Sequence, residues 1–290
     1  MINLAERSYK KEILDIDNIP FADIRQNMQE LNAVNTHLGG HAITISGIKK
    51  LLGPNINKTI TICEIGCGGG DNLHAIDKWC TKNNVNVTFI GIDIKQECVD
   101  FAQQQYPLLA CRWIKADYKN VPFIDYKPDI IFSSLFCHHF NDQELIFMLQ
   151  WMKKHSAKGF FINDLHRHWL AYYSIQNITR IFSRSYLVKN DAPLSVARGF
   201  KKDEWKELMK NAGIQNYFIK WRWAFRYLIL YSKLPHLPLY YSIVGMNLFV
   251  YFAPTYGEYF TYKKTKTKIS ITFNFVDQSK GTTTEFKKLN

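Results

Sequence analysis

The sequence predicts an α/β fold: a doubly wound, mainly parallel sheet of seven strands that ends in an antiparallel hairpin, with N-terminal helices and a helical lid insert. Two observations support this prediction. Short apolar runs alternate with helical stretches between residues 59 and 163, as in a parallel sheet covered on both faces. Two later apolar runs, 214–220 and 225–231, are separated by only four residues. Because a parallel crossover needs a longer connection, these two runs indicate a hairpin.

The first fifty residues predict two helices. Within 23–41, apolar side chains recur at spacings of three and four, at Ile24, Met28, Leu31 and Val34. Gly39 and Gly40 would end this helix, and 41–52 would form a second helix that stops at Gly53. We therefore treat 1–54 as an N-terminal helical region that can act as part of a lid.

The central part of the chain supplies the sheet. The expected strands are 59–65, 87–93, 111–116, 129–133 and 159–163, and the expected helices are 72–82, 96–105 and 143–155. An insert at 166–201 then interrupts the alternation before a helix at 202–212 and the hairpin. Within this insert, 191–198 is interpreted as a loop around Pro193. The predicted domain is 55–233, and 234–290 is an extension that is first hydrophobic and then basic.

Charge is distributed unevenly. The net charge is +12, yet residues 1–140 carry 14 basic and 15 acidic side chains, and 141–290 carry 23 and 10. This asymmetry indicates an acidic partner for the C-terminal half: an anionic small-molecule substrate, a membrane surface or nucleic acid. The alternative is a basic surface without a specific partner. The six cysteines show no spacing typical of a zinc site, so no metal is predicted. The charged N-terminus lacks the apolar core of a signal peptide, which favours a cytoplasmic protein.

The C-terminal extension contains an uncharged run at 237–257, followed by a lysine-rich stretch. A run of this length can enter a membrane, although two prolines and a glycine interrupt it. The alternative is an extension buried in protein. The final residues predict one strand followed by a polar, disordered tail.

A glycine-rich turn links the first expected strand to the next helix. The sequence runs Glu64-Ile-Gly66-Cys-Gly68-Gly-Gly70-Asp71. Glycines between a strand and a helix allow the backbone to approach a ligand closely and direct amides at an anionic group. A nicotinamide-binding loop would place its third glycine at position 71, which is Asp here. The alternative is a tight turn without a ligand.

Two aspartates follow the second and third expected strands. Asp93 ends the run VTFIGID, and an ionised carboxylate at this position can accept hydrogen bonds from both hydroxyls of a ribose. The alternative role for Asp93 is a helix N-cap. Asp117 lies just beyond 111–116.

These motifs together resemble class I, Rossmann-like methyltransferases that use S-adenosylmethionine, of the bacterial small-molecule type. The resemblance covers about 46–231. It implies that Glu64, Gly66, Gly68 and Gly70 form the cofactor loop and that Asp93 holds the ribose. It further implies that Ile94 packs on the adenine, that Asp117 accepts from the adenine amino group, and that Ser133 ends the fourth strand beside the sulfonium. The N/D-P-P-Y/F element of base-amino methyltransferases is missing after this strand, which disfavours nucleic acid as the substrate.

Candidate catalytic residues follow the fourth and fifth strands. Asp164, His166 and Arg167 form one cluster, and His139 belongs to a second, His138-His139. They are candidates for a general base and for anion binding, and the alternative for each histidine is a structural hydrogen bond. The apolar insert predicts an enclosed site. We therefore expect methyl transfer to a small hydrophobic or aromatic acceptor at an oxygen. The alternatives are an NAD-dependent oxidoreductase and a non-catalytic module that binds the cofactor.

Overall fold

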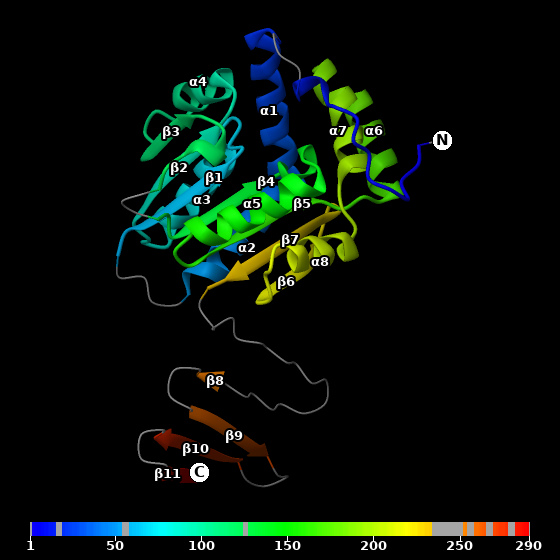
Figure 1. Ribbon diagram of the computed structural model, residues 1–290. Helices are drawn as coiled ribbons and strands as arrows, with labels where there is room; N and C mark the ends of the chain where they lie inside the picture. The colour runs from blue at the N-terminus through cyan, green and yellow to red at the C-terminus, as the bar shows by residue number, and fades with distance from the viewer. Residues whose placement is uncertain are drawn as a thin grey trace. The chain divides into compact units, whose positions relative to one another are not determined.

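The computed structural model describes residues 2–15, 19–53, 58–123 and 127–233, together with the backbone of four later strands. The chain divides into two compact units, Met1–Lys233 and Leu234–Asn290. The first unit contains a seven-stranded sheet with helices on both faces (Figure 1).

The strand order of the sheet is β3-β2-β1-β4-β5-β7-β6. The strands are β1 (Ile60–Ile65), β2 (Val87–Asp93), β3 (Cys111–Lys115), β4 (Ile130–Ser134), β5 (Gly159–Leu165), β6 (Tyr217–Arg222) and β7 (Arg226–Ser232). The first five strands pair in parallel, whereas β7 is antiparallel to both β5 and β6. The predicted fold class is therefore confirmed, including the terminal hairpin.

Alternate side chains of the central strands point to opposite faces of the sheet and pack against the helices on each face. On β5, the ring of Phe161 lies against Gly47, so closely that a Cβ on that glycine would come within 2.6 Å of it. Phe160 and Ile162 point to the opposite face and join a buried cluster with Met148 and Trp205. The sheet therefore lies between α2 (Gly40–Leu52) on one face and α5 (Asp142–His155) with α8 (Lys202–Asn211) on the other. The remaining helices of the sheet region are α3 (Asp71–Lys82) and α4 (Gln96–Gln105).

The insert after β5 forms two helices, α6 (Trp169–Phe182) and α7 (Tyr186–Arg198), which pack on each other. Helix α7 also contacts α1 (Phe21–His37) and the short turns η1 (Ile13–Asp15) and η3 (Cys137–His139). The predicted loop at 191–198 is wrong, because α7 continues through Pro193. Although proline removes one helical hydrogen bond, Asp191 accepts hydrogen bonds from the amides of Ile13 and Leu14, and the last turn of the helix is buried.

The second unit contains a four-stranded antiparallel sheet in the order β11-β10-β9-β8. Its strands are β8 (Phe252–Ala253), β9 (Glu258–Lys264), β10 (Ile269–Asp277) and β11 (Thr282–Leu289). The predicted disordered tail is wrong for Thr282–Leu289, since this segment pairs with β10 along its length. Within the described part of the chain, no helix is long and apolar enough to cross a membrane. Apart from β8, the run 237–257 lies outside the described residues.

Candidate functional site

The glycine-rich turn adopts a conformation that side chains would not tolerate. Gly66, Gly68 and Gly70 have positive φ angles of 67°, 49° and 77°. A Cβ on Gly66 would lie 2.2 Å from the ring of Phe136, and a Cβ on Gly70 would lie 2.5 Å from Trp113. The turn thus requires glycine both for backbone conformation and for space. Gly70 is the N-cap residue of α3, so that helix begins directly at the turn.

Asp93 holds this turn in place from the end of β2. Its Oδ2 accepts a hydrogen bond from the Gly68 amide at 2.8 Å, and its Oδ1 accepts one from the Lys95 amide at 2.9 Å. Burial raises the pKa of Asp93, and these two amides oppose that shift. Asp93 thus supports the glycine turn, and its bond to Lys95 closes a turn just before α4, whose N-cap residue is Lys95 rather than Asp93. Each carboxylate oxygen keeps a further lone pair for a ligand.

Glu64 lies beneath the turn rather than in it. Its side chain is buried, and its Oε1 accepts a hydrogen bond from Asn72 at 3.0 Å. Oε2 has no hydrogen-bond partner among the described residues. Burial raises the pKa of Glu64 well above its usual value, and the nearby Asp71 adds to the shift. Glu64 therefore supports the base of α3 through Asn72.

A first cavity of about 360 Å³ opens above the turn. Its walls include most of the residues that the sequence assigned to a cofactor: Gly66, Gly68, Asp93, Ile94 and Asp117. Ile94 is 63% exposed, so an apolar surface faces the cavity. Asp117 accepts a hydrogen bond from the Lys119 amide at 3.0 Å.

The expected position of Ser133 is wrong. Its hydroxyl lies in the core, 3.4 Å from Cys137 Sγ, and its neighbour Ser134 lines the first cavity instead. Ser133 and Ser134 are neighbours on β4, and successive side chains of a strand point to opposite faces of the sheet. Ser134 therefore faces the cavity when Ser133 faces the core.

A second cavity, also of about 360 Å³, lies between the N-terminal segment and the insert. Much of its wall is apolar and comes from three helices: Leu31, Val34 and Leu38 of α1, Ile175 and Ile178 of α6, and Val188 and Val196 of α7. The turn between β6 and β7 closes another side with residues 223–226. Four residues line both cavities, namely Leu14, Leu31, Leu135 and His139. The two cavities are therefore neighbours that share a wall.

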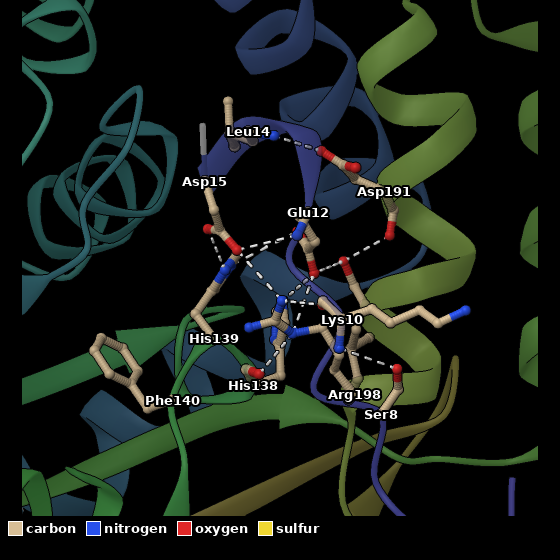
Figure 2. Close-up of polar contacts among 12 residues, drawn as sticks. Ser8, Lys10, Glu12, Leu14, Asp15, His138, His139, Phe140, Asp191 and Arg198 are labelled. Carbon is tan, nitrogen blue, oxygen red and sulfur yellow. Dashed lines mark hydrogen bonds and ion pairs between the residues drawn. The ribbon is translucent and has the colours of Figure 1, made fainter. Parts of the chain in front are cut away.

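Polar side chains gather at this shared wall (Figure 2). Glu12 reaches from the N-terminal segment toward the two histidines of η3, with Oε1 3.5 Å from His138 Nε2 and Oε2 3.8 Å from His139 Nε2. Ser195 donates a hydrogen bond to Glu12 Oε1 at 2.8 Å. Burial raises the pKa of Glu12 to about 7, against the opposing charges of His139 and Arg198.

A carboxylate contacts the other ring nitrogen of each histidine. His138 Nδ1 lies 2.8 Å from Asp164 Oδ1, and His139 Nδ1 lies 2.8 Å from Asp15 Oδ1. Burial raises the pKa of Asp15, but the hydrogen bond and charge of His139 outweigh it, and the net result is a pKa of about 2. Asp164 shows the same balance with His138, and its pKa is lowered.

The turn that carries these histidines is fixed from several sides. Arg198 Nε donates to the His138 carbonyl at 3.0 Å, and Arg7 Nη2 donates to the Phe140 carbonyl at 2.8 Å. Leu135, which precedes the turn, has a left-handed φ of 52°. Such a conformation costs a non-glycine residue about 1–2 kcal/mol, and it persists here at the wall shared by the two cavities.

The predicted cluster Asp164, His166 and Arg167 does not come together at either cavity. Asp164 is buried under η3, where it accepts from the Cys137 amide at 2.7 Å. His166 points away from the cavities toward Tyr227, and burial lowers its pKa to about 4. Leu165, between them, faces the second cavity. Strand alternation explains this placement, since Asp164 and His166 project from the opposite face to Leu165.

Arg167 belongs to a buried structural network. It contacts Glu204 and donates hydrogen bonds to the carbonyls of Leu4, Ala5 and Gly199. It therefore ties the N-terminal segment to the insert. Of the four predicted catalytic residues, His139 is the one that lines both cavities.

Sequence reasoning missed Glu12, Asp15 and Leu14 in the N-terminal segment. They reach the site through contacts separated by more than a hundred residues along the chain, as in the bond between Asp15 and His139. No local periodicity marks this segment. The acidic residues at 12 and 15 were the available signal, although acidic pairs of this kind are common on surfaces.

Comparison with known proteins yields a match to part of the sheet region and a similarity of fold. Residues 62–159 match a family model described as a methyltransferase domain. The fold is similar to that of the plantazolicin methyltransferase BpumL in complex with S-adenosylhomocysteine, at 15% identity over 73% of this chain and 95% of that one, with a TM-score of 0.54. It is also similar to human N-acetylserotonin methyltransferase in complex with S-adenosylmethionine, at 16% identity over 74% and 56% of the two chains (TM-score 0.53).

A methyltransferase from Aquifex aeolicus that depends on S-adenosylmethionine is similar at 16% identity over 75% of this chain and all of that one (TM-score 0.52). No curated protein matches the sequence. At these identities the structural likeness concerns the fold. Together with the match over residues 62–159, it shows that this chain has a class I methyltransferase fold.

Proposed function

We propose that this chain is a class I methyltransferase. It would move a methyl group from S-adenosylmethionine in the first cavity to an oxygen of a small apolar or aromatic acceptor in the second. The observation that carries the proposal is the shared wall: His139, Leu135, Leu31 and Leu14 line both cavities. Two molecules bound on either side of this wall would be held within reach of each other, and such positioning supplies much of the rate of a displacement reaction.

The residues of the first cavity suit the parts of S-adenosylmethionine. Asp93 retains lone pairs for the ribose hydroxyls, Ile94 offers an apolar surface to the adenine, and Asp117 can accept from the adenine amino group. The glycine turn brings backbone amides toward the amino-acid end of the cofactor. Ser134 rather than Ser133 would lie near the sulfonium.

The second cavity suits an acceptor with an apolar body. Much of its wall is apolar and comes from α1, α6 and α7. We therefore assign 1–54 and the insert 166–201 to the lid of the domain 55–233, with 234–290 as a separate extension. Enclosure by such a lid would exclude water from the methyl group.

Methyl transfer to a hydroxyl oxygen requires that the hydroxyl be ionised beforehand or lose its proton during the transfer. The oxygen pair forms the new bond to the methyl carbon, the carbon–sulfur bond breaks, and its electrons neutralise the sulfonium, which leaves S-adenosylhomocysteine. The proton of the hydroxyl is lost on the acceptor side, where Glu12 and His139 lie at the polar end of the cavity.

Two other functions fit the geometry less well. A nicotinamide-binding loop would need glycine at position 71, but Asp71 accepts hydrogen bonds there from Asn35 at 2.9 Å and contacts His41 at 2.8 Å. A non-catalytic module that only binds the cofactor would not need the second cavity.

The experiment is a screen with methyl-labelled S-adenosylmethionine against phenols, quinols, carboxylic acids and amines of similar size. We expect label to enter hydroxyl compounds with an apolar body. Transfer to amines alone would contradict the oxygen assignment, and absence of transfer to the whole panel in a protein that binds the cofactor would favour the non-catalytic alternative.

A further inference from the structure

The two histidines of η3 each bind a carboxylate through Nδ1 and direct Nε2 toward Glu12. His138 Nδ1 and His139 Nδ1 each lie 2.8 Å from a carboxylate oxygen, of Asp164 and Asp15 respectively. A carboxylate at Nδ1 stabilises the tautomer with a proton on that nitrogen and leaves the lone pair on Nε2. Carboxylate–histidine pairs of this kind orient the histidine ligands of metal ions.

Both Nε2 atoms face the carboxylate of Glu12, at 3.5 and 3.8 Å. The ligand atoms of the three side chains all lie within 4.8 Å of one another. Zinc binds imidazole nitrogen and carboxylate oxygen at about 2.0–2.2 Å, so that two ligands of one tetrahedral ion lie roughly 3.3 Å apart. Shifts of the order of an ångström would therefore bring all three side chains onto a single ion.

The charges around this point also favour a cation. Three carboxylates, those of Glu12, Asp15 and Asp164, contact the histidines. The guanidinium of Arg198 lies 3.3 Å from Asp15 and 3.9 Å from Glu12. With neutral imidazoles and an ionised Glu12, the carboxylates exceed the guanidinium by two negative charges. A divalent cation would favour the ionised form of Glu12 and balance this excess, which is otherwise costly for the buried Glu12 and Asp164.

From these contacts we propose that Glu12, His138 and His139 bind a divalent transition-metal ion of the type that prefers nitrogen and oxygen ligands, such as Zn²⁺. The spacing of cysteines predicted no metal site, and these ligands come instead from two segments that are distant in sequence. The side chains of Glu12 and His138 are only 4% and 3% exposed, whereas that of His139 is 19% exposed and lines both cavities. A fourth coordination position would thus open toward the cavities, as in catalytic rather than structural zinc sites.

The consequence for activity rests on the proposed function. An ion at this position would stabilise the ionised form of an acceptor hydroxyl, so that its proton passes to solvent before methyl transfer, and Glu12 and His139 would then act as ligands rather than as proton acceptors. Metal binding itself needs neither cofactor nor acceptor, so it can fail while methyl transfer stands, and the reverse also holds.

The test uses the full chain, stripped with a chelator and titrated with Zn²⁺ in competition with a chromophoric chelator. We expect one ion per chain, and with Co²⁺ as the probe we expect visible absorption bands of a four- or five-coordinate ion. The absence of stoichiometric Zn²⁺ binding would overturn the proposal and leave the cluster as a buried network of ion pairs. Binding of Mg²⁺ with equal affinity would also overturn it, because Mg²⁺ prefers oxygen ligands.

Variants locate the ion. His139→Ala and Glu12→Gln should each lower Zn²⁺ affinity by more than about a hundredfold, and Asp15→Asn, which removes only a carboxylate that orients His139, by about 10–100-fold. The matched control is His37→Ala, on the exposed end of α1, which should bind as the unaltered chain does. Unchanged affinity in Glu12→Gln and His139→Ala would place the ion elsewhere. The Co²⁺ spectrum of the unaltered chain decides the case if a variant fails to fold.

Discussion

Replacement of Asp93 by asparagine tests how the cofactor cavity works. The carboxylate accepts from the Gly68 amide at 2.8 Å and from the Lys95 amide at 2.9 Å, and it would also accept from the ribose. Asparagine keeps one acceptor oxygen and places two N–H donors where the other oxygen was. We therefore expect Asp93→Asn to lose one charged hydrogen bond to the backbone or to the ribose, at a cost of about 1.5–3 kcal/mol.

That cost corresponds to roughly a ten- to a hundredfold loss of affinity for S-adenosylhomocysteine. Isothermal titration calorimetry measures it directly, and the thermal midpoint of the ligand-free variant reports any loosening of the glycine turn. Asp100→Asn is the matched control, since Asp100 is half-buried on α4, contacts Gln96 and does not line the first cavity. Unchanged affinity in a folded Asp93→Asn protein would refute the role of this carboxylate in the cavity.

Four other outcomes are expected. Gly66→Ala should lower the free energy of unfolding, measured in urea, by about 2–5 kcal/mol, because the cost of a left-handed φ and that of a clash with Phe136 add. Gly39→Ala is the control and should cost only about 1–2 kcal/mol, because Gly39 is also left-handed but a Cβ there would meet open space. Asp164→Asn should lower the free energy of unfolding by roughly 3 kcal/mol, since it breaks the buried pair with His138. A variant that loses turnover but keeps its full stability would contradict this structural role and indicate a catalytic one. Burial lowers the pKa of His166 to about 4, so the unfolded chain takes up the proton at a higher pH than the folded chain does. The free energy of unfolding should therefore fall as the pH is lowered from about 6.5 to 4, and His166→Leu should flatten this slope in urea titrations at several pH values. If 237–257 enters lipid, the full chain should sediment with anionic vesicles and a chain ending at 233 should not; equal partitioning would contradict this.

Local patterns were sufficient for most of the fold. The strands of the sheet are apolar runs bounded by glycine or polar residues, and the short link between β6 and β7 allowed only a hairpin. The glycine turn and Asp93 were recognisable because the residues that shape the cofactor cavity are close in sequence to the strand ends that carry them.

The acceptor side could not be predicted in this way. The partners of His139 are Glu12 and Asp15, more than a hundred positions away, and no periodicity links them. The cluster at 164–167 looked functional because its residue types are chemically versatile, but the alternation of β5 turned Asp164 into the core and His166 toward Tyr227. Pro193 similarly indicated a loop, whereas packing of α7 against α1 stabilised a helix.

Calorimetric titration of the full chain with S-adenosylhomocysteine, and in parallel with NAD, tests the central claim most directly. We expect S-adenosylhomocysteine to bind at one site per chain, with an affinity that Asp93→Asn weakens, and NAD to give no saturable heat. Saturable binding of NAD without binding of S-adenosylhomocysteine would contradict the assignment of the first cavity and, with it, the proposed methyl transfer.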